Sequence, residues 1–443
     1  MIRCANLVGD AKAIELPGRT VPVAERVDVL VCGGGPAGLG AAIAAAEEGA
    51  GVLLVEAAEA LGGTASSGLV PGWPPVAGAD GGVFARLNDQ AAAFAPGARA
   101  IRDNGWASVN AEVWKIVCLD AVTAVGARVR FGTFAHEALV DGAGRVCGAL
   151  VANKAGAQAM RATVTIDATG DGDLAVAAGA GFDKGRDGDG RLQAVSFLFK
   201  LAGVEASRVP RWSEVREAGR AAMASGALSL PDYVQPHLGG ALPVDAPGVR
   251  LFQFDTSVGI DASDPVSRTQ GLCEGYQRVR EVYQWLRAKV PGFERAVLAD
   301  VAAQLGVRET RRIHGDATVD REDVLSARKY PDGIARGSFY MDLHDGQVKT
   351  PELKASLSPP PGDWYEIRYG ALLPRAVEGL LVAGRCVSST REANGSLRVQ
   401  PTCMATGEAA GVAAAMAARE GVGPRRISGE AVRQRLRQRG AAI

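Results

Sequence analysis

The chain has 443 residues, of which 47% are hydrophobic and 22% are charged. This length predicts two domains or one large domain with an insertion, and the composition is that of an ordinary globular protein. Lysine plus arginine and aspartate plus glutamate both total 49, so the formal net charge is zero. A dedicated nucleic-acid-binding protein carries a basic footprint, so we expect no nucleic-acid partner.

Seven cysteines are scattered along the sequence without a C-x-x-C pair. We therefore predict no metal site and no vicinal redox pair, but reduced thiols in a cytoplasmic protein. Residues 1–20 lack the apolar core of a signal peptide and are expected to be an irregular lead-in. The longest apolar stretches, residues 27–55 and 401–418, are interrupted by glycine or charge, so no membrane span is predicted.

Residues 27–56 read VDVLVCGGGPAGLGAAIAAAEEGAGVLLVE. This pattern predicts a buried strand, a glycine-rich turn, a helix that ends at Gly49 and a second strand over 52–55. The turn fits G-x-G-x-x-G, and an acid follows the second strand. A β-α-β unit with these features predicts a dinucleotide-binding site rather than a structural glycine-rich turn. The predicted ligand-binding residues are Gly33, Gly35, Pro36, Ala37, Gly38 and Glu56.

Each of these residues has a physical role. Gly33 permits the tight turn, Gly35 lets a pyrophosphate approach the backbone, and Gly38 lets the helix pack closely on the strand. The phosphates meet free N–H groups at the helix N-terminus. Glu56 accepts hydrogen bonds from ribose hydroxyl groups.

Residues 62–68 are too rich in glycine and serine for regular structure, so a loop is expected. Residues 128–167 alternate in the manner of strands and predict a three-stranded antiparallel meander that leads into one last buried strand. That strand ends at Ala168, Thr169 and Gly170, and a helix is expected to continue through residue 178.

The pattern changes after a polar loop at residues 183–190. Strands are predicted at 193–203 and 249–256, and Asp264 with Pro265 begins a helix that runs to about Lys289. A second helix is expected from Phe293 to Leu305. A buried strand at 380–383 and a helix of small residues from about Thr402 to Arg419 complete the chain.

The fold class predicted from this order is α/β. A Rossmann-like domain with a parallel sheet and a β-meander would comprise residues 22–190 and 375–443. An inserted α+β substrate domain would comprise residues 191–374.

Three segments carry a family resemblance: LGVRETRRI at 305–313, MDLH at 341–344 and the block at 380–414. With them, residues 22–420 resemble the glutathione-reductase-type flavoproteins. The chain is more closely similar to FAD-dependent oxidoreductases related to the flavoprotein subunits of succinate dehydrogenase and fumarate reductase.

The resemblance implies FAD as the cofactor. The dinucleotide motif would hold its ADP half, and the N-terminus of the last helix would stabilise negative charge on the reduced flavin. Further residues are implied along the cofactor, namely Gly62, Gly63, Thr64, Ala135, Ala168, Thr169, Gly170, Gly384, Arg385, Cys403 and Met404. Residues 56–70 contain no histidine, where some relatives attach flavin covalently, so non-covalent FAD is expected.

The sequence departs from the family near the expected flavin face. Arg368, Tyr369 and Gly370 stand where members commonly have Pro-Tyr-Arg, and Arg391 stands where many have histidine. The substrates of better-known members are therefore not transferred to this chain.

Arginine is suited to bidentate recognition of carboxylates. Arg308, Arg311 and Arg368 are candidate substrate-binding residues, and the candidate catalytic residues are His344, Arg398 and Arg312. For the cluster of arginines at 308–312, a solvated face or structural ion pairs with Glu309, Asp316 or Glu322 remain open. His344 remains open as a structural histidine.

The predicted activity is transfer of a hydride from a small polar or acidic organic substrate to flavin N5, by a dehydrogenase or oxidase. One alternative is a flavin monooxygenase or reductase that uses free NAD(P)H. Another is a scaffold that holds FAD without redox chemistry. The electron acceptor (dioxygen, a quinone or an electron-transfer protein) and a homo-oligomeric state are left open.

Overall fold

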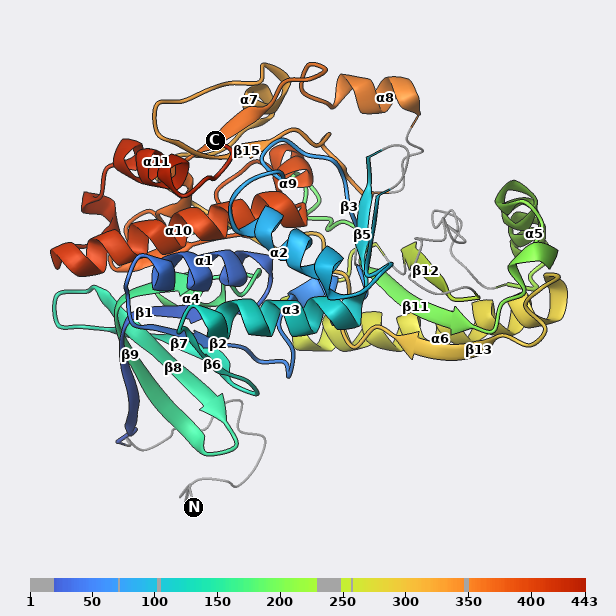
Figure 1. Ribbon diagram of the computed structural model, residues 1–443, viewed down its shortest axis with the longest axis horizontal. Helices are drawn as coiled ribbons and strands as arrows, with labels where there is room; N and C mark the ends of the chain where they lie inside the picture. The colour runs from blue at the N-terminus through green and yellow to red at the C-terminus, as the bar shows by residue number, and fades with distance from the viewer. Residues whose placement is uncertain (1–19, 71, 102–104, 229–247, 256–257, 346–349) are drawn as a thin grey trace.

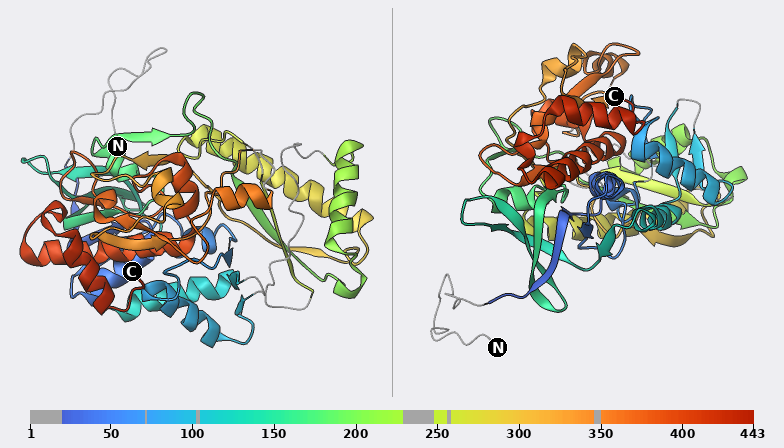
Figure 2. Two further views of the ribbon diagram at one scale, coloured as in Figure 1. Left: turned by 90° about the horizontal axis from the view of Figure 1, so that it is seen from above. Right: turned by 60° about the vertical axis from the view of Figure 1, so that its left-hand side comes forward.

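The computed structural model describes residues 20–70, 72–101, 105–228, 248–255, 258–345 and 350–443. A mixed sheet with helices against it forms the larger part of the described chain, and an arm extends from one side (Figures 1 and 2). The expected lead-in at residues 1–20 lies, except for residue 20, outside the described residues.

The central sheet runs in the order β6-β2-β1-β9-β8-β7, and β17 pairs with the end of β9. The neighbours β6-β2, β2-β1, β1-β9 and β9-β17 are parallel, whereas β7, β8 and β9 form an antiparallel meander. The long strand β9 belongs to both parts, so they form one sheet. The strands are β1 (Val23–Cys32), β2 (Val52–Val55), β6 (Arg128–Arg130), β7 (Phe134–Val140), β8 (Val146–Asn153), β9 (Gly156–Asp167) and β17 (Leu380–Val382).

Alternate side chains of β1 enter two different cores. Val29 and Val31 face the larger core together with the helices, and Leu30 and Cys32 face a smaller core together with residues of the meander. Because successive side chains of a strand point to opposite faces, a strand buried on both faces must be apolar throughout. This accounts for the uninterrupted apolar run at residues 29–32.

Helices α1 (Pro36–Glu47) and α10 (Gln400–Glu420) lie side by side above the sheet (Figure 1). Glycines make this approach possible. A Cβ atom on Gly40 would lie 2.3 Å from the carbonyl oxygen of Met404, and one on Gly407 would lie 1.9 Å from that of Ala37. The other helices of this part are α2 (Gly82–Phe94), α3 (Ala111–Ala124), α4 (Asp173–Ala177), α7 (Arg321–Leu325), α8 (Pro351–Ser356), α9 (Arg391–Leu397) and α11 (Gly429–Gln438).

The arm has its own hydrophobic core. Its antiparallel sheet has the order β12-β11-β13, and the long helix α6 lies along it (Figure 1). The arm comprises β11 (Ser196–Ala202), α5 (Trp212–Ala224), β12 (Arg250–Asp255), α6 (Pro265–Lys289) and β13 (Val297–Val301). Three small sheets lie elsewhere in the described chain. One has three strands, in the order β3 (Gly72–Trp73), β5 (Ala107–Val109) and β4 (Arg99–Ile101). The other two are the pairs β10 (Phe182–Lys184) with β14 (Arg311–Ile313) and β15 (Gly333–Gly337) with β16 (Tyr365–Arg368).

The predicted α/β fold class is confirmed, and several predicted elements match closely. Helix α1 ends at Glu47 just before Gly49, whose φ is +87°. Helix α6 begins after Asp264, whose side chain accepts a hydrogen bond from the backbone N–H of Ser267. Helix α10 extends one or two residues beyond the predicted bounds at each end.

Two predicted elements were wrong. Residues 293–305 contain the strand β13 rather than a helix, because the segment returns to pair with β11 and tertiary pairing overrides its helix propensity. Residues 128–140 are two strands rather than one. After β6 the chain turns at Gly132, whose φ is +57°, so that β6 pairs with β2 while β7 begins the meander.

The predicted division into two domains stays a proposal. Buried residues between Val319 and Leu373 belong to the same core as α1 and α10, whereas the core of the arm ends at Val307. This grouping favours an inserted unit that ends near residue 307 rather than near residue 374.

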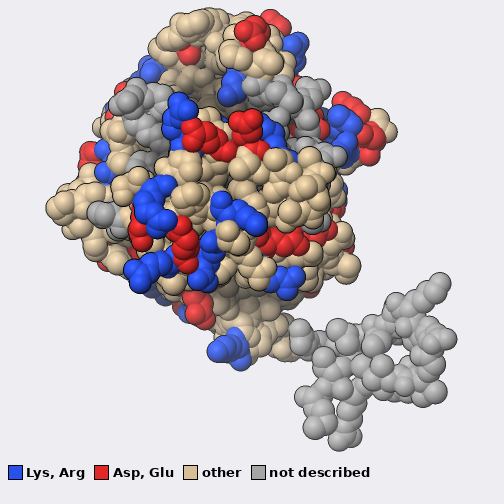
Figure 3. All heavy atoms as spheres, turned by 90° about the vertical axis from the view of Figure 1, so that its right-hand side faces the viewer, with Lys and Arg blue, Asp and Glu red and all other residues tan. Residues whose placement is uncertain are grey.

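Positive and negative side chains are interspersed on the face of the arm shown in Figure 3. None of the helices in the described ranges combines the length and apolar character needed to cross a bilayer.

Candidate functional site

The glycines of the dinucleotide motif differ in the space around them. Gly33 has φ +106°, and a Cβ atom there would lie 2.4 Å from the carbonyl oxygen of Ala168. A Cβ atom on Gly38 would lie 1.7 Å from the carbonyl oxygen of Gly33. Beside Gly35, by contrast, the nearest atom would be Gly63 Cα at 4.0 Å. The middle glycine therefore borders open space at the start of α1, as a phosphate site requires.

Glu56 closes this turn from the end of β2. One carboxylate oxygen accepts a hydrogen bond from the backbone N–H of Gly34 at 2.5 Å, and the other accepts one from Ala58 at 2.8 Å. A carboxylate has about four acceptor positions, so two contacts leave capacity for ribose hydroxyl groups. The half-buried side chain is thus held in place by the loop that would surround a nucleotide.

The predicted loop at residues 62–68 contains one 3-10 turn, Gly63–Ala65, that includes Thr64. Gly62 and Gly63 have φ angles of +102° and +55°, and the N–H of Gly62 donates to the carbonyl oxygen of Gly34 at 2.9 Å. The loop therefore lies directly against the dinucleotide motif. Beside it, the indole N–H of Trp114 is buried and has no hydrogen-bond partner among the described residues.

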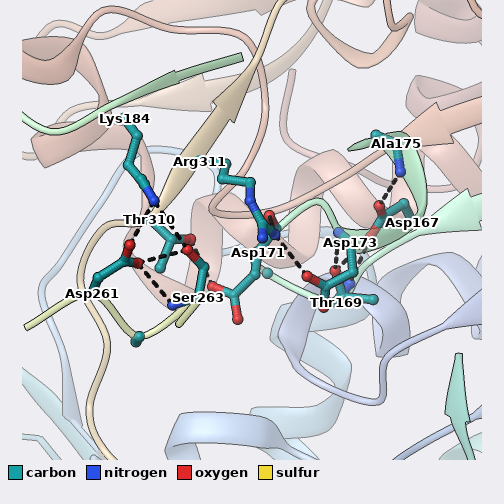
Figure 4. Close-up of polar contacts among 12 residues, drawn as sticks. Asp167, Thr169, Asp171, Asp173, Ala175, Lys184, Asp261, Ser263, Thr310 and Arg311 are labelled. Carbon is teal, nitrogen blue, oxygen red and sulfur yellow. Dashed lines mark hydrogen bonds and ion pairs between the residues drawn. The ribbon is translucent and has the colours of Figure 1, made fainter. Parts of the chain in front are cut away.

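The end of β9 adds a third backbone segment. Ala168 donates to the carbonyl oxygen of Cys32 at 2.8 Å, which places it beside Gly33. The Asp167 carboxylate accepts hydrogen bonds from the Thr169 hydroxyl at 2.7 Å and from the backbone N–H of Ala175 at 2.9 Å (Figure 4). Burial raises the pKa of this carboxyl to about 6, against the effect of those hydrogen bonds.

Arg385 joins this segment to the end of the arm. Its guanidinium donates to the carbonyl oxygens of Gly170 at 2.9 Å and Val307 at 2.5 Å, and to the Asp171 carboxylate at 2.5 Å. Three of the five guanidinium donors are therefore used in protein contacts. The preceding residue, Gly384, has φ +86° and lies against α1.

The N-terminus of α10 points into the same region, but it begins earlier than predicted. Cys403 donates its N–H to the carbonyl oxygen of Val399 at 2.9 Å, so Cys403 and Met404 lie inside the helix and their backbone donors are used. The earlier residues Gln400 and Thr402 supply the unpaired end. The Thr402 hydroxyl is buried without a hydrogen-bond partner.

Ala135 lies at the start of the meander, where it is 6% exposed and packs in the small core with Cys32 and Val55. The adjacent Thr133 donates its backbone N–H to the carbonyl oxygen of Glu56 at 3.0 Å. Ala135, implied along the cofactor, is thus close to Glu56, the predicted ribose-binding acid.

Several of the arginines named as candidates from the sequence lie in a buried cluster near the start of α10. Arg308 and Arg312 are 7% and 3% exposed, so the solvated-face interpretation was wrong for them. Arg312 and Arg391 both pair with Glu309, at 3.5 and 3.3 Å, and Arg391 also pairs with Asp345 at 3.4 Å. Arg312 is therefore engaged in the structural ion pair that the sequence left open, and its Nε and Nη1 atoms make no hydrogen bond.

His344 and Arg398 meet at a single carboxylate, that of Asp342. His344 Nε2 lies 3.0 Å from Asp342 Oδ2, and the Tyr340 hydroxyl donates to Oδ1 at 2.8 Å. Arg398 Nη2 donates to the Asp342 carbonyl oxygen at 2.8 Å and lies 3.7 Å from Oδ2. Burial, followed by the nearby Asp342 charge, raises the pKa of Tyr340, and burial lowers the pKa of Arg398.

Gln193, just before β11, completes this group. Its Oε1 accepts a hydrogen bond from the backbone N–H of His344 at 3.0 Å and one from Arg398 Nη2 at 3.5 Å. Arg308 donates to the carbonyl oxygen of the next residue, Ala194, at 2.5 Å. The beginning of the arm thus contacts His344, Arg398 and Arg308 together.

Two candidate arginines lie elsewhere. Arg311, on β14, pairs with Asp173 at 2.8 Å (Figure 4). Arg368 is exposed, pairs with Asp332 at 3.0 Å and lies 4.9 Å from the centre of the Tyr330 ring. Each of these two arginines pairs with a carboxylate outside the group formed by His344, Asp342 and Arg398.

Gln193 and Asp342 were not selected from the sequence. Asp342 lies two residues before His344 in the quoted MDLH motif, and that spacing could have suggested a carboxylate-histidine pair. For Gln193 the sequence offers no such signal, since its position depends on how β11 packs against residues 341–345.

The residues around the turn fit FAD. Open space beside Gly35, remaining acceptor capacity on Glu56 and the buried unpaired Trp114 N–H suit a dinucleotide with many polar groups. Within the described ranges there is no group of three or more histidine, cysteine, aspartate or glutamate residues that could hold a metal ion.

A comparison with protein families agrees with this fit. A family model described as FAD dependent oxidoreductase matches residues 28–436. The comparison with curated proteins found no match. Similar solved structures include a geranylgeranyl bacteriochlorophyll reductase-like protein from Thermoplasma acidophilum, with 14% identity over 94% of this chain and 84% of that one and a TM-score of 0.47.

Two further structures are the myxobacterial chondrochloren halogenase CndH and the p-nitrophenol 4-monooxygenase PnpA from Pseudomonas putida DLL-E4. The first has 12% identity over 94% of this chain and 79% of that chain, with a TM-score of 0.42. The second has 14% identity over 66% and 70%, with a TM-score of 0.39. The match of the family model over most of the sequence shows that the chain belongs to the FAD-dependent oxidoreductase family and that FAD is its cofactor.

Proposed function

We propose that the protein is an FAD-dependent dehydrogenase or oxidase that removes a hydride from a small organic anion. FAD would be held non-covalently between the dinucleotide motif, the loop at 62–64 and the N-terminus of α10. The relationship to the glutathione-reductase-type and succinate dehydrogenase flavoproteins, suggested by the sequence motifs, remains part of this proposal.

The observation that supports this proposal is the buried arginine cluster next to the start of α10. Arg312, Arg391 and Arg398 pair with the carboxylates of Glu309, Asp342 and Asp345. Arg308 is also buried and donates to the carbonyl oxygen of Ala194. Buried guanidinium groups are donors suited to an acidic ligand, so the cluster favours a bound anion.

The chemistry assigned to the chain is substrate binding and removal of a proton. Arg398 and Arg308 would bind the acidic group, and His344 would accept the proton as the hydride leaves the adjacent carbon. The 3.0 Å contact with Asp342 holds the imidazole of His344 in a fixed orientation. Bound FAD supplies the two-electron acceptor.

The alternative, a flavin monooxygenase or reductase that uses free NAD(P)H, differs in the source of electrons. Anaerobic mixing of the holoprotein with hydroxy acids, amino acids, sugars and dicarboxylates, and separately with NADH and NADPH, distinguishes the two. Bleaching of the flavin absorbance by an organic anion without NAD(P)H is the expected result. Bleaching by NAD(P)H alone would overturn the proposal, and a flavin that no reductant cycles would favour the scaffold alternative.

A further inference from the structure

Two buried hydrogen-bond donors near His344 have no hydrogen-bond partner among the described residues. They are Gln193 Nε2 and Arg398 Nε. Gln193 is 1% exposed, and the Arg398 side chain is 13% exposed. Because a buried unsatisfied donor is unfavourable, such groups are expected to meet a ligand.

The orientation of the Gln193 amide follows from its neighbours. The backbone N–H of His344 and the guanidinium of Arg398 can only donate, so the oxygen of the amide must face them. The amide nitrogen is then the unpaired end of the side chain, with two protons to donate. Arg398 is fixed in the same manner, since its Nη2 donates to the Asp342 carbonyl oxygen and its Nε remains unpaired.

We propose that Gln193 Nε2 and Arg398 Nε form a subsite for a single carboxylate, and that the substrate is a small hydroxy monocarboxylate. This inference rests on the proposed function. One neutral donor and one charged donor suit the two oxygens of a carboxylate. Two donors match one carboxylate group, so a monocarboxylate is favoured over a dicarboxylate.

The substrate's second polar group is a hydroxyl, because His344 beside the subsite would accept its proton. The hydroxyl proton passes to His344 as the C–H bond of the same carbon breaks, and the hydride with its two electrons goes to FAD. The C–O bond becomes a carbonyl, so a hydroxy acid yields an oxo acid and reduced cofactor. The proton on His344, the hydride on FAD and the oxo acid together account for all atoms and electrons of the hydroxy acid.

Binding of the oxo-acid products tests the subsite without turnover. Oxidised holoprotein is titrated by calorimetry with pyruvate, 2-oxobutyrate and phenylglyoxylate, and with the corresponding amides as neutral matches. We expect at least one acid to bind at least tenfold more tightly than its amide. Equal affinity for every acid and its amide would overturn the inference.

The variant Gln193→Glu keeps an acceptor for His344 and Arg398 but replaces the donor with a carboxylate oxygen. We expect it to weaken binding of the acid at least tenfold and to leave binding of the amide and of FAD unchanged. Gln434→Glu, on the exposed face of α11, introduces the same charge change as a control. If Gln193→Glu weakens FAD binding but not acid binding, the two donors serve the cofactor and the inference is wrong.

The failure of this inference can be separated from that of the proposed function. Binding of an acid that depends on Gln193, without flavin reduction by any hydroxy acid, would leave the subsite standing and contradict the dehydrogenase activity. Flavin reduction by other anions, such as amino acids or dicarboxylates, together with equal binding of each oxo acid and its amide, would support the dehydrogenase activity and contradict the subsite.

Discussion

The carbonyl oxygen of Gly33 occupies the position that a Cβ atom on Gly38 would need, at a distance of 1.7 Å. This contact holds the first turn of α1 against the end of β1. We therefore expect Gly38→Ala to lower the free energy of unfolding by about 3 kcal/mol or more, since the backbone must shift. Urea unfolding of the apoprotein measures the change. Gly142→Ala, where a Cβ atom meets nothing within 4 Å, is the control, and equal stability of the two variants would contradict this reading.

Glu56 is expected to contribute to FAD affinity through the ribose. Glu56→Gln keeps the size of the side chain but removes the charge that strengthens its hydrogen bonds. A loss of about 1–3 kcal/mol corresponds to roughly 5- to 150-fold weaker FAD binding. Fluorescence titration of apoprotein with FAD measures it, and Glu59→Gln at a neighbouring exposed position is the control. Unchanged affinity in Glu56→Gln would show that the ribose is not held here.

Asp167 should give stability a pH dependence of its own. Burial raises the pKa of its carboxyl to about 6 in the folded protein, so the folded state holds this proton more tightly than the unfolded chain does. The resulting stabilisation is fully present below about pH 4 and is lost as pH rises through about 6, a change of roughly 3 kcal/mol.

The variant Asp167→Asn has no such proton to lose. With saturating FAD, the free energy of unfolding of the variant minus that of the unsubstituted protein should therefore rise by roughly 2 kcal/mol between pH 4 and pH 7. A difference that stays constant over this range would mean that Asp167 is not a buried titrating group.

His344 is expected to affect chemistry more than cofactor binding. His344→Gln should slow anaerobic flavin reduction by the substrate about 10²–10⁴-fold, while FAD affinity remains unchanged. Asp342→Asn should slow it less, because it removes the group that orients the imidazole but not the base itself. Stopped-flow absorbance of the flavin provides the rates, and a His344→Gln variant with the original rate would remove His344 from the mechanism.

The strand, helix and strand around the dinucleotide motif could be predicted because their sequence constraints are local. Gly33, Gly38 and Glu56 occur at fixed spacings around a strand and a helix, and the structure keeps those spacings. The contacts of Gly407 with α1 could not be predicted in the same way, since they depend on where α10 packs.

The substrate side was less predictable for the same physical reason. Arg308 and Arg311 are three residues apart, yet one reaches the buried cluster and the other pairs with Asp173. The strand β13 was expected to be a helix, because the edge of β11 that it pairs with is not visible in its own sequence. Gln193 gains its importance only from contacts with residues about 150 and 205 positions away.

Binding of FAD to the variant Gly35→Ala tests the central claim most directly. The site of the added Cβ atom is open, with the nearest atom 4.0 Å away, so the apoprotein should unfold at the same urea concentration as the unsubstituted chain. The methyl group would, however, occupy the space where a pyrophosphate must approach the backbone. Equilibrium dialysis should find one FAD per unsubstituted chain and binding at least tenfold weaker in the variant. Unchanged FAD affinity in a stably folded Gly35→Ala protein would contradict the account.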